Sequence, residues 1–148
     1  MRLLAENINK LNTGWNERPL GEADFYRLCR RFSVKVTEMP LSVGGFYYRV
    51  GGRDFIAVNS RLAGTEKLAV LFHELGHFLF HAPDNGATAN FHRVGTRTRK
   101  EREADVFALC ALIPRGEIET RPTEDLIDQG FSHETIAARR AVYKRHGL

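Results

Sequence analysis

Apolar residues along the chain change their spacing from helical to extended. Between residues 22 and 32 they recur every three or four positions, which predicts one face of a helix. Residues 33–37 alternate between polar and apolar side chains, while residues 46–50 and 53–58 are rich in aromatic or β-branched types. The Gly51-Gly52 pair between the last two segments readily forms a primed hairpin turn. The pattern therefore predicts a helix followed by a small antiparallel sheet.

The helical spacing returns in the second half of the chain. Residues 100–114 predict one helix, and a short helix at 125–130 precedes a longer one at 133–146 that Ser132 can cap. Ahead of these, a helix that Thr65 can cap is predicted from apolar side chains at steps of three and four: Leu68, Leu71, Phe72, Leu75 and Leu79.

These elements fit one α+β domain, because 148 residues with 43% hydrophobic content can bury a single core. Residues 1–20 contain several Asn together with Gly and Pro, and we expect a loosely ordered N-terminal lead-in there. Residues 21–122 are predicted to form the core, in which a small antiparallel sheet packs on a pair of helices. Residues 123–148 are predicted to be a C-terminal helical segment packed on that core.

The clearest chemical signal is the HExxH motif of His73, Glu74 and His77. Residues four apart on a helix differ by about 40° around its axis, so both imidazoles point the same way. Two imidazoles on one face are half of a tetrahedral zinc site, and the adjacent Glu is placed to take a proton from water at the metal. A chance match would usually fall outside a helical pattern. We therefore interpret this segment as a metal site.

The helix predicted at residues 100–114 offers a third ligand. Glu101 and Asp105 are four apart and share a face, so Glu101 can complete a His₂Glu site while Asp105 accepts the remaining N–H of a ligating histidine. Glu103 competes with Glu101, since it lies about 200° round the helix and both cannot face the metal. Alternatively, these acidic residues form a solvated first turn that favours the helix dipole.

Four other side chains are candidates for supporting roles. His81 lies one turn beyond the motif, where we expect packing or orientation of a ligand rather than ligation. His92, in the long connection of residues 82–99, is a candidate donor to the oxyanion of a tetrahedral intermediate. An exposed loop histidine is the alternative. His133 and Tyr143 are weaker candidates for the same role.

Composition excludes several classes of protein. No segment approaches the 18 or so apolar residues of a membrane span, and the N-terminus lacks the apolar stretch of a signal peptide. Cys29 and Cys110 are the only cysteines, and we expect Cys110 to be a buried thiol rather than half of a disulfide. These features favour a cytoplasmic protein.

The net charge of +4 changes the picture little. Basic residues gather at 93–102 and again at 139–145. No zinc-finger or RNA-binding motif accompanies them, so we interpret them as surface charge and do not expect direct nucleic-acid binding.

The two motifs in this order resemble the ImmA/IrrE family of metallopeptidases. Its pattern is HELGHxLLH, then ExxA-N/D-xFA and a Leu-Leu-x-Pro stretch, and the similar segments here are residues 73–81, 101–108 and 112–114. Residues 55–59 also resemble the strand that precedes the family's metal helix, so the resemblance covers roughly residues 20–148. This sequence departs at Leu112-Ile113 and at Asp105, where the family frequently has Asn. An Asp at that position is similar to the ExxxD helix of gluzincin peptidases.

The resemblance implies a zincin-type core and a zinc-dependent metallo-endopeptidase. It implies that His73, His77 and Glu101 bind Zn²⁺ and that Glu74 is the catalytic base, although such a site also accepts Mn²⁺ or Co²⁺. Members of the family are associated with cleaving helix–turn–helix repressors to release mobile-element or stress genes, which implies a repressor or an antitoxin-like protein as substrate. The alternatives are a non-cleaving, zinc-stabilised regulatory module that binds a repressor or DNA, and a small-peptide hydrolase.

Overall fold

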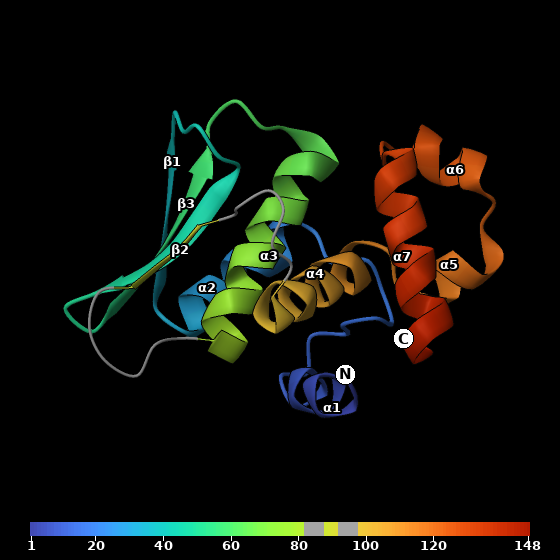
Figure 1. The fold of residues 1–148 in the computed structure, drawn as a ribbon, viewed down its shortest axis with the longest axis horizontal. Helices are drawn as coiled ribbons and strands as arrows, with labels where there is room; N and C mark the ends of the chain where they lie inside the picture. Colours follow the sequence, from blue (N-terminus) through green and yellow to red (C-terminus); the bar gives the residue numbers. More distant parts are fainter. Residues whose placement is uncertain (82–87, 92–97) are drawn as a thin grey trace.

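The protein is an α+β domain in which a sheet, a central helix pair and a group of C-terminal helices lie side by side (Figure 1). The structure, a computed structural model, describes residues 1–81, 88–91 and 98–148. Its helices and strands follow in this order: α1 (Arg2–Asn9), α2 (Glu22–Arg31), β1 (Val34–Met39), β2 (Gly45–Val50), β3 (Arg53–Asn59), α3 (Gly64–His81), β4 (Thr88–Phe91), α4 (Arg99–Leu112), α5 (Arg115–Thr120), α6 (Thr123–Asp128) and α7 (His133–His146).

The sheet has the strand order β1-β3-β2-β4. Strands β2 and β3 form the predicted antiparallel hairpin, and Gly51 and Gly52 both have positive φ, as a primed turn requires. Strand β1, however, pairs with β3 in parallel. The predicted α+β class is confirmed, but the sheet is mixed rather than antiparallel. Because β2 runs back between them in the chain, β1 and β3 point the same way.

Helices α3 and α4 pack closely at Gly76. A Cβ added there would lie 3.1 Å from Cδ1 of Phe107 and 3.2 Å from Cα of Ala104, so glycine permits this approach of the two helices. Helix α4 begins after Thr98, whose Oγ1 accepts the N–H of Glu101 at 3.2 Å. The helix pair therefore has fixed spacing and register where the HExxH motif lies.

Thr65 does not cap α3 as we expected. It lies inside the first turn, and its hydroxyl donates to the carbonyl oxygen of Gly130 at 2.7 Å. The prediction was wrong because α3 begins at Gly64, two residues earlier than a Thr65 cap requires. The side chain instead fastens the start of α3 to the loop before α7.

The N-terminal segment contains a helix that the sequence pattern did not predict. Leu4 and Ile8 of α1 are buried one turn apart. Trp15 follows in the same segment, 3% exposed, and its indole N–H donates to the carbonyl oxygen of Phe107 at 2.9 Å. Residues 1–20, expected to be loosely ordered, are therefore attached to the core through these three side chains.

The C-terminal helices lie on the side of α4 away from the sheet (Figure 1). As predicted, Ser132 caps α7 by accepting the N–H of Thr135 at 3.1 Å. Arg139, which we grouped with the basic surface residues, is fully buried, and its guanidinium donates hydrogen bonds to the backbone carbonyl oxygens of Ile113 and Leu148. Helix α5 was not predicted. Helix α4 ends at Leu112, and Pro114 is the N-cap of α5.

Both cysteines are free and buried, which confirms the prediction for Cys110. Burial raises the pKa of the Cys29 thiol to about 12 and that of Cys110 to about 11, so both thiols stay protonated near neutral pH. Among the residues that the structure describes, no helix is both long and apolar enough to span a membrane.

Candidate metal centre

Helix α3 presents two imidazoles from consecutive turns on a buried face. His73 and His77 are 3% and 2% exposed, and their Nε2 atoms lie 3.1 Å apart. Helical spacing explains this convergence, because residues four apart lie one above the other. The two Nε2 atoms therefore face a common point, and the Nδ1 atoms face other partners.

Helix α4 brings Glu101 to the same point. Its Oε1 lies 2.9 Å from Nε2 of His77 and its Oε2 lies 3.2 Å from Nε2 of His73. Among the described residues, these three side chains are the group that could hold a metal ion. Zinc bonds of about 2.0–2.1 Å in tetrahedral geometry would separate ligand atoms by about 3.3 Å. Two imidazoles and one carboxylate at these separations therefore fit a zinc ion.

Asp105 contacts His73 on the side of the ring that faces away from the metal position. Its Oδ1 lies 2.8 Å from Nδ1 of His73, the arrangement that directs Nε2 of His73 towards the metal position. Burial opposes protonation of His73, but the hydrogen bonds to Asp105 and Glu101 outweigh it and raise the pKa of His73 to about 9. A metal ion bound here at neutral pH would therefore displace a proton from His73.

Glu74 is completely buried beside the cluster. Its negative charge contributes to the raised pKa of His73. Strand β2 passes close by at Gly45, where an added Cβ would lie 2.7 Å from the carbonyl oxygen of Ala57, 2.8 Å from Cγ1 of Val70 and 3.6 Å from Cγ of Glu74. Only glycine lets the strand lie this close to α3. We did not single out Gly45, although the Gly44-Gly45 pair before an aromatic strand was a visible signal.

His81 and Glu103 contact each other rather than the metal position. Nδ1 of His81 lies 3.2 Å from Nδ1 of His77, and Nε2 of His81 lies 2.9 Å from Oε2 of Glu103. Burial would raise the pKa of Glu103, but hydrogen bonds from His81 and Arg99 lower it, so the carboxyl group is ionised. The competition between Glu101 and Glu103 is thus resolved, because they contact successive turns of α3.

Of the remaining candidates, the two that the structure describes, His133 and Tyr143, are not brought to this cluster. His92 lies outside the described residues. His133 is exposed at the start of α7. The guanidinium carbon of Arg115 lies over the ring of Tyr143, 5.7 Å from the centroid of that ring. No residue described here is therefore assigned to the oxyanion.

A cavity of about 220 Å³ adjoins the cluster between α3, α4 and α7. His73 and Asp105 form part of its wall together with apolar side chains of α4, and Glu134 and Thr135 contribute from α7. The end of the helix pair that carries the candidate metal site therefore has open volume next to His73.

The fold and the site define a metallopeptidase domain of the HExxH class, with the third ligand on a second helix. The model of the IrrE N-terminal-like domain (peptidase family M78) matches residues 29–142. The chain belongs to this ImmA/IrrE family of metallopeptidases. Among curated proteins and among solved structures, no match was found.

Proposed function

We propose that this metallopeptidase is a zinc-dependent endopeptidase that cleaves one protein partner, a helix–turn–helix repressor or an antitoxin-like protein. The observation that carries the proposal is the convergence of His73, His77 and Glu101 within hydrogen-bonding distance of one another, with Glu74 buried beside them. When bound, zinc would supply Lewis-acid chemistry to the substrate carbonyl and to water.

The residues of the chain then have separate tasks. Glu74 takes the proton from the attacking water and can pass it to the leaving amine. His73 stays in one orientation because Asp105 binds its Nδ1. Gly45 keeps β2 against α3, so the carboxylate of Glu74 is shielded from bulk water.

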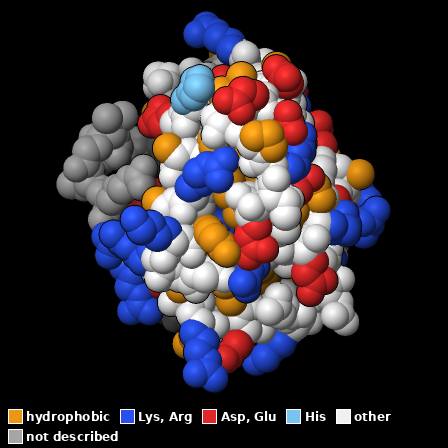
Figure 2. Space-filling model, turned by 90° about the vertical axis from the view of Figure 1, so that its right-hand side faces the viewer, with side chains coloured by type: hydrophobic (Ala, Val, Ile, Leu, Met, Phe, Trp, Pro, Cys, Tyr) orange, Lys and Arg blue, Asp and Glu red, His pale blue; other side chains and the backbone are white. Residues whose placement is uncertain are grey.

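Two observations favour a protein substrate over DNA. Family membership associates the chain with peptide-bond hydrolysis. The face formed by the C-terminal helices carries basic and acidic side chains interspersed, without one continuous basic stripe (Figure 2). A mixed surface of this kind suits docking to another folded protein, which would explain how a small domain selects one substrate.

The test is cleavage of a repressor encoded next to this chain. The zinc-loaded protein should produce a discrete fragment, and Glu74→Gln should bind zinc equally but cut roughly 10²–10⁴-fold more slowly. Mass spectrometry of the digest and metal analysis of both proteins measure these outcomes. Chelation followed by addition of Zn²⁺, Mn²⁺ or Co²⁺ shows which metal restores the rate.

Other outcomes would redirect the assignment. Cleavage at the parental rate by Glu74→Gln would remove Glu74 from the role of base. A stable complex with the repressor but no fragment would favour the non-cleaving regulatory module. Release of single residues from unrelated peptides would instead indicate a small-peptide hydrolase.

A further inference from the structure

His73 and His77 differ in the side chain that contacts Nδ1, the ring nitrogen that faces away from the metal position. A metal-binding imidazole offers the lone pair of one nitrogen, so its other nitrogen carries a proton and needs an acceptor. For His73 the acceptor is the carboxylate of Asp105, at 2.8 Å. For His77 the atom opposite Nδ1 is Nδ1 of His81, at 3.2 Å.

His81 can accept that proton only in one tautomer. A neutral imidazole has one N–H and one acceptor nitrogen, so Nδ1 of His81 accepts when its proton sits on Nε2. Glu103 places Oε2 2.9 Å from Nε2 of His81, where it takes a hydrogen bond from that N–H. Arg99 in turn donates from Nε to Oε1 of Glu103 at 2.7 Å, which keeps the carboxylate pointing at His81.

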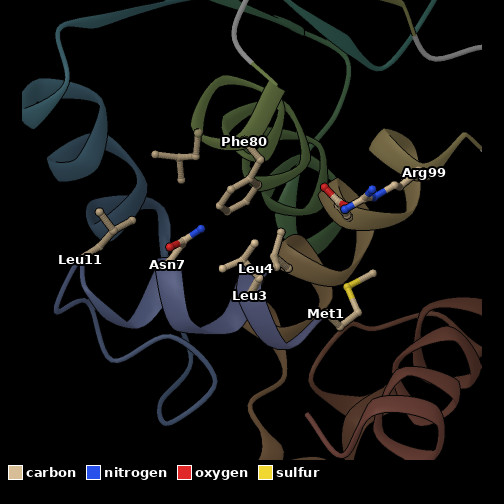
Figure 3. A pocket seen from close by; sticks show the side chains of 9 residues that line it. Met1, Leu3, Leu4, Asn7, Leu11, Phe80 and Arg99 are labelled. Carbon is tan, nitrogen blue, oxygen red and sulfur yellow. The ribbon is translucent and has the colours of Figure 1, made fainter.

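Burial strengthens this chain of contacts. The side chains of His81 and Glu103 are 5% and 17% exposed, so water competes weakly for their hydrogen bonds. Arg99 is 85% exposed and lies at the wall of a cavity of about 380 Å³ between α1 and the end of α3, with Phe80 and Leu4 across from it (Figure 3). The chain of contacts thus runs from the metal position to the surface.

We propose that His81 and Glu103 are positioning residues that fix the tautomer and orientation of His77, as Asp105 does for His73. This inference rests on the proposed metal site. His81 is then not a ligand, and the fourth residue after the HExxH motif acts through His77. Arg99, being exposed, contributes less than the two buried members.

Zinc affinity, measured by competition with a chromogenic chelator, tests the proposal. His81→Leu removes the acceptor and should weaken zinc binding about 10–100-fold, the usual effect of removing such a partner. His81→Asn should recover part of this loss, because its side-chain oxygen can take the place of Nδ1. Glu103→Gln should weaken binding less than His81→Leu, and Arg99→Gln should weaken it least.

The chain offers a matched control in Arg115 and Glu119. This pair has the same spacing on its helix and the same distance of 2.7 Å as Arg99 and Glu103, but it lies on α5. Glu119→Gln should leave zinc affinity unchanged. Unchanged affinity in His81→Leu, with Glu101→Ala still losing zinc, would overturn the positioning role while leaving the proposed function intact.

A second measurement does not depend on any variant folding. A long-range ¹H–¹⁵N correlation spectrum of the zinc-loaded wild type should show His77 protonated at Nδ1 and His81 at Nε2. A proton on Nδ1 of His81 would overturn the proposal. If the wild type failed to bind zinc at all, both the proposed function and this inference would fall together.

Discussion

Two clusters of buried polar side chains lie at opposite ends of α4, and they are satisfied in different ways. At the N-terminal end, the Nε2 atoms of His73 and His77 and the carboxylate of Glu101 converge on one position. At the C-terminal end, Arg139 donates three hydrogen bonds to oxygen atoms: Ile113 O at 2.6 Å, Leu148 O at 3.0 Å and Asn16 Oδ1 at 2.9 Å. In the metal-free first cluster, His73 carries a proton that a metal ion could displace, whereas the positive charge of the second cluster belongs to Arg139 itself. Burial alone therefore does not distinguish a candidate metal site from a structural cluster, but the convergence of side-chain atoms that could bind a metal does.

The largest effect that separates the two clusters should come from Glu101→Ala. Structural zinc sites with four ligands bind with about 10–16 kcal/mol, so loss of one ligand should weaken zinc binding by roughly 3 kcal/mol or more, over a hundredfold. Chelator competition measures the affinity, and urea unfolding in EDTA measures stability. The metal-free stability should fall by less than this, because in that state the variant loses only the contacts of Glu101 with His73 and His77. A large loss of metal-free stability would instead make the first cluster structural.

Arg139→Met should show the opposite behaviour. It removes three hydrogen bonds, including the one to the buried carbonyl oxygen of Ile113, which should lower the free energy of unfolding by about 3 kcal/mol, while zinc stoichiometry stays at the parental value. Arg140→Met is the matched control, because Arg140 is the next residue and binds the carbonyl oxygens of Ile118 and Arg121 nearer the surface. It should cost about 1 kcal/mol or less. Equal losses in the two variants would show that burial of Arg139 contributes nothing special.

The ligands were predictable from the sequence, but their supports were only partly so. His73, Glu74 and His77 share one helix, so their geometry follows from spacing alone. Glu101 and Asp105 required only the assumption that a second helix packs against the first. The structure brings all five together, although zinc at the site remains a prediction.

The features that the sequence did not reveal depend on how helices and strands pack against one another. The contact of His81 with Glu103 depends on which turns of α3 and α4 meet, and no pattern within either helix encodes this. Arg139 and Arg140 are neighbours of the same type, yet only tertiary packing decides which is buried. The parallel pairing of β1 likewise depends on where the chain between β1 and β2 leads.

The free energy of unfolding of the metal-free protein should fall as pH rises, and His73 of the first cluster should cause this pH dependence. The folded-state pKa of His73 is about 9, above the ordinary value of 6.5, so its contribution is complete below pH 6.5 and is lost towards pH 9. Between pH 6.5 and 8 the loss should be about 2 kcal/mol by urea unfolding in EDTA. Zinc affinity should rise over the same range, because binding releases that proton.

Two variants test whether His73 causes this pH dependence of stability. His73→Ala should flatten it, while Arg139→Met should keep it, because a guanidinium does not titrate in this range. The window stops at pH 8 because unfolded cysteines begin to ionise above it. A flat curve for the wild type would mean that His73 is neutral in the metal-free fold.

The smallest effect should come from the apolar contact that lies between the two clusters. Gly76→Ala places a Cβ 3.1–3.2 Å from Phe107 and from the backbone of Ala104, so α3 and α4 must separate by a few tenths of an ångström. Overpacking costs about 1–3 kcal/mol, and the gain in helix propensity offsets about 1 kcal/mol, so the net loss should be about 1 kcal/mol. Gly116→Ala in α5 has open space around the added methyl and should not destabilise the protein. If Gly76→Ala also weakens zinc binding severalfold while Arg139→Met does not, the apolar contact sets the separation of the ligands. If zinc affinity stays constant, the polar contacts alone must hold Glu101 opposite the two histidines.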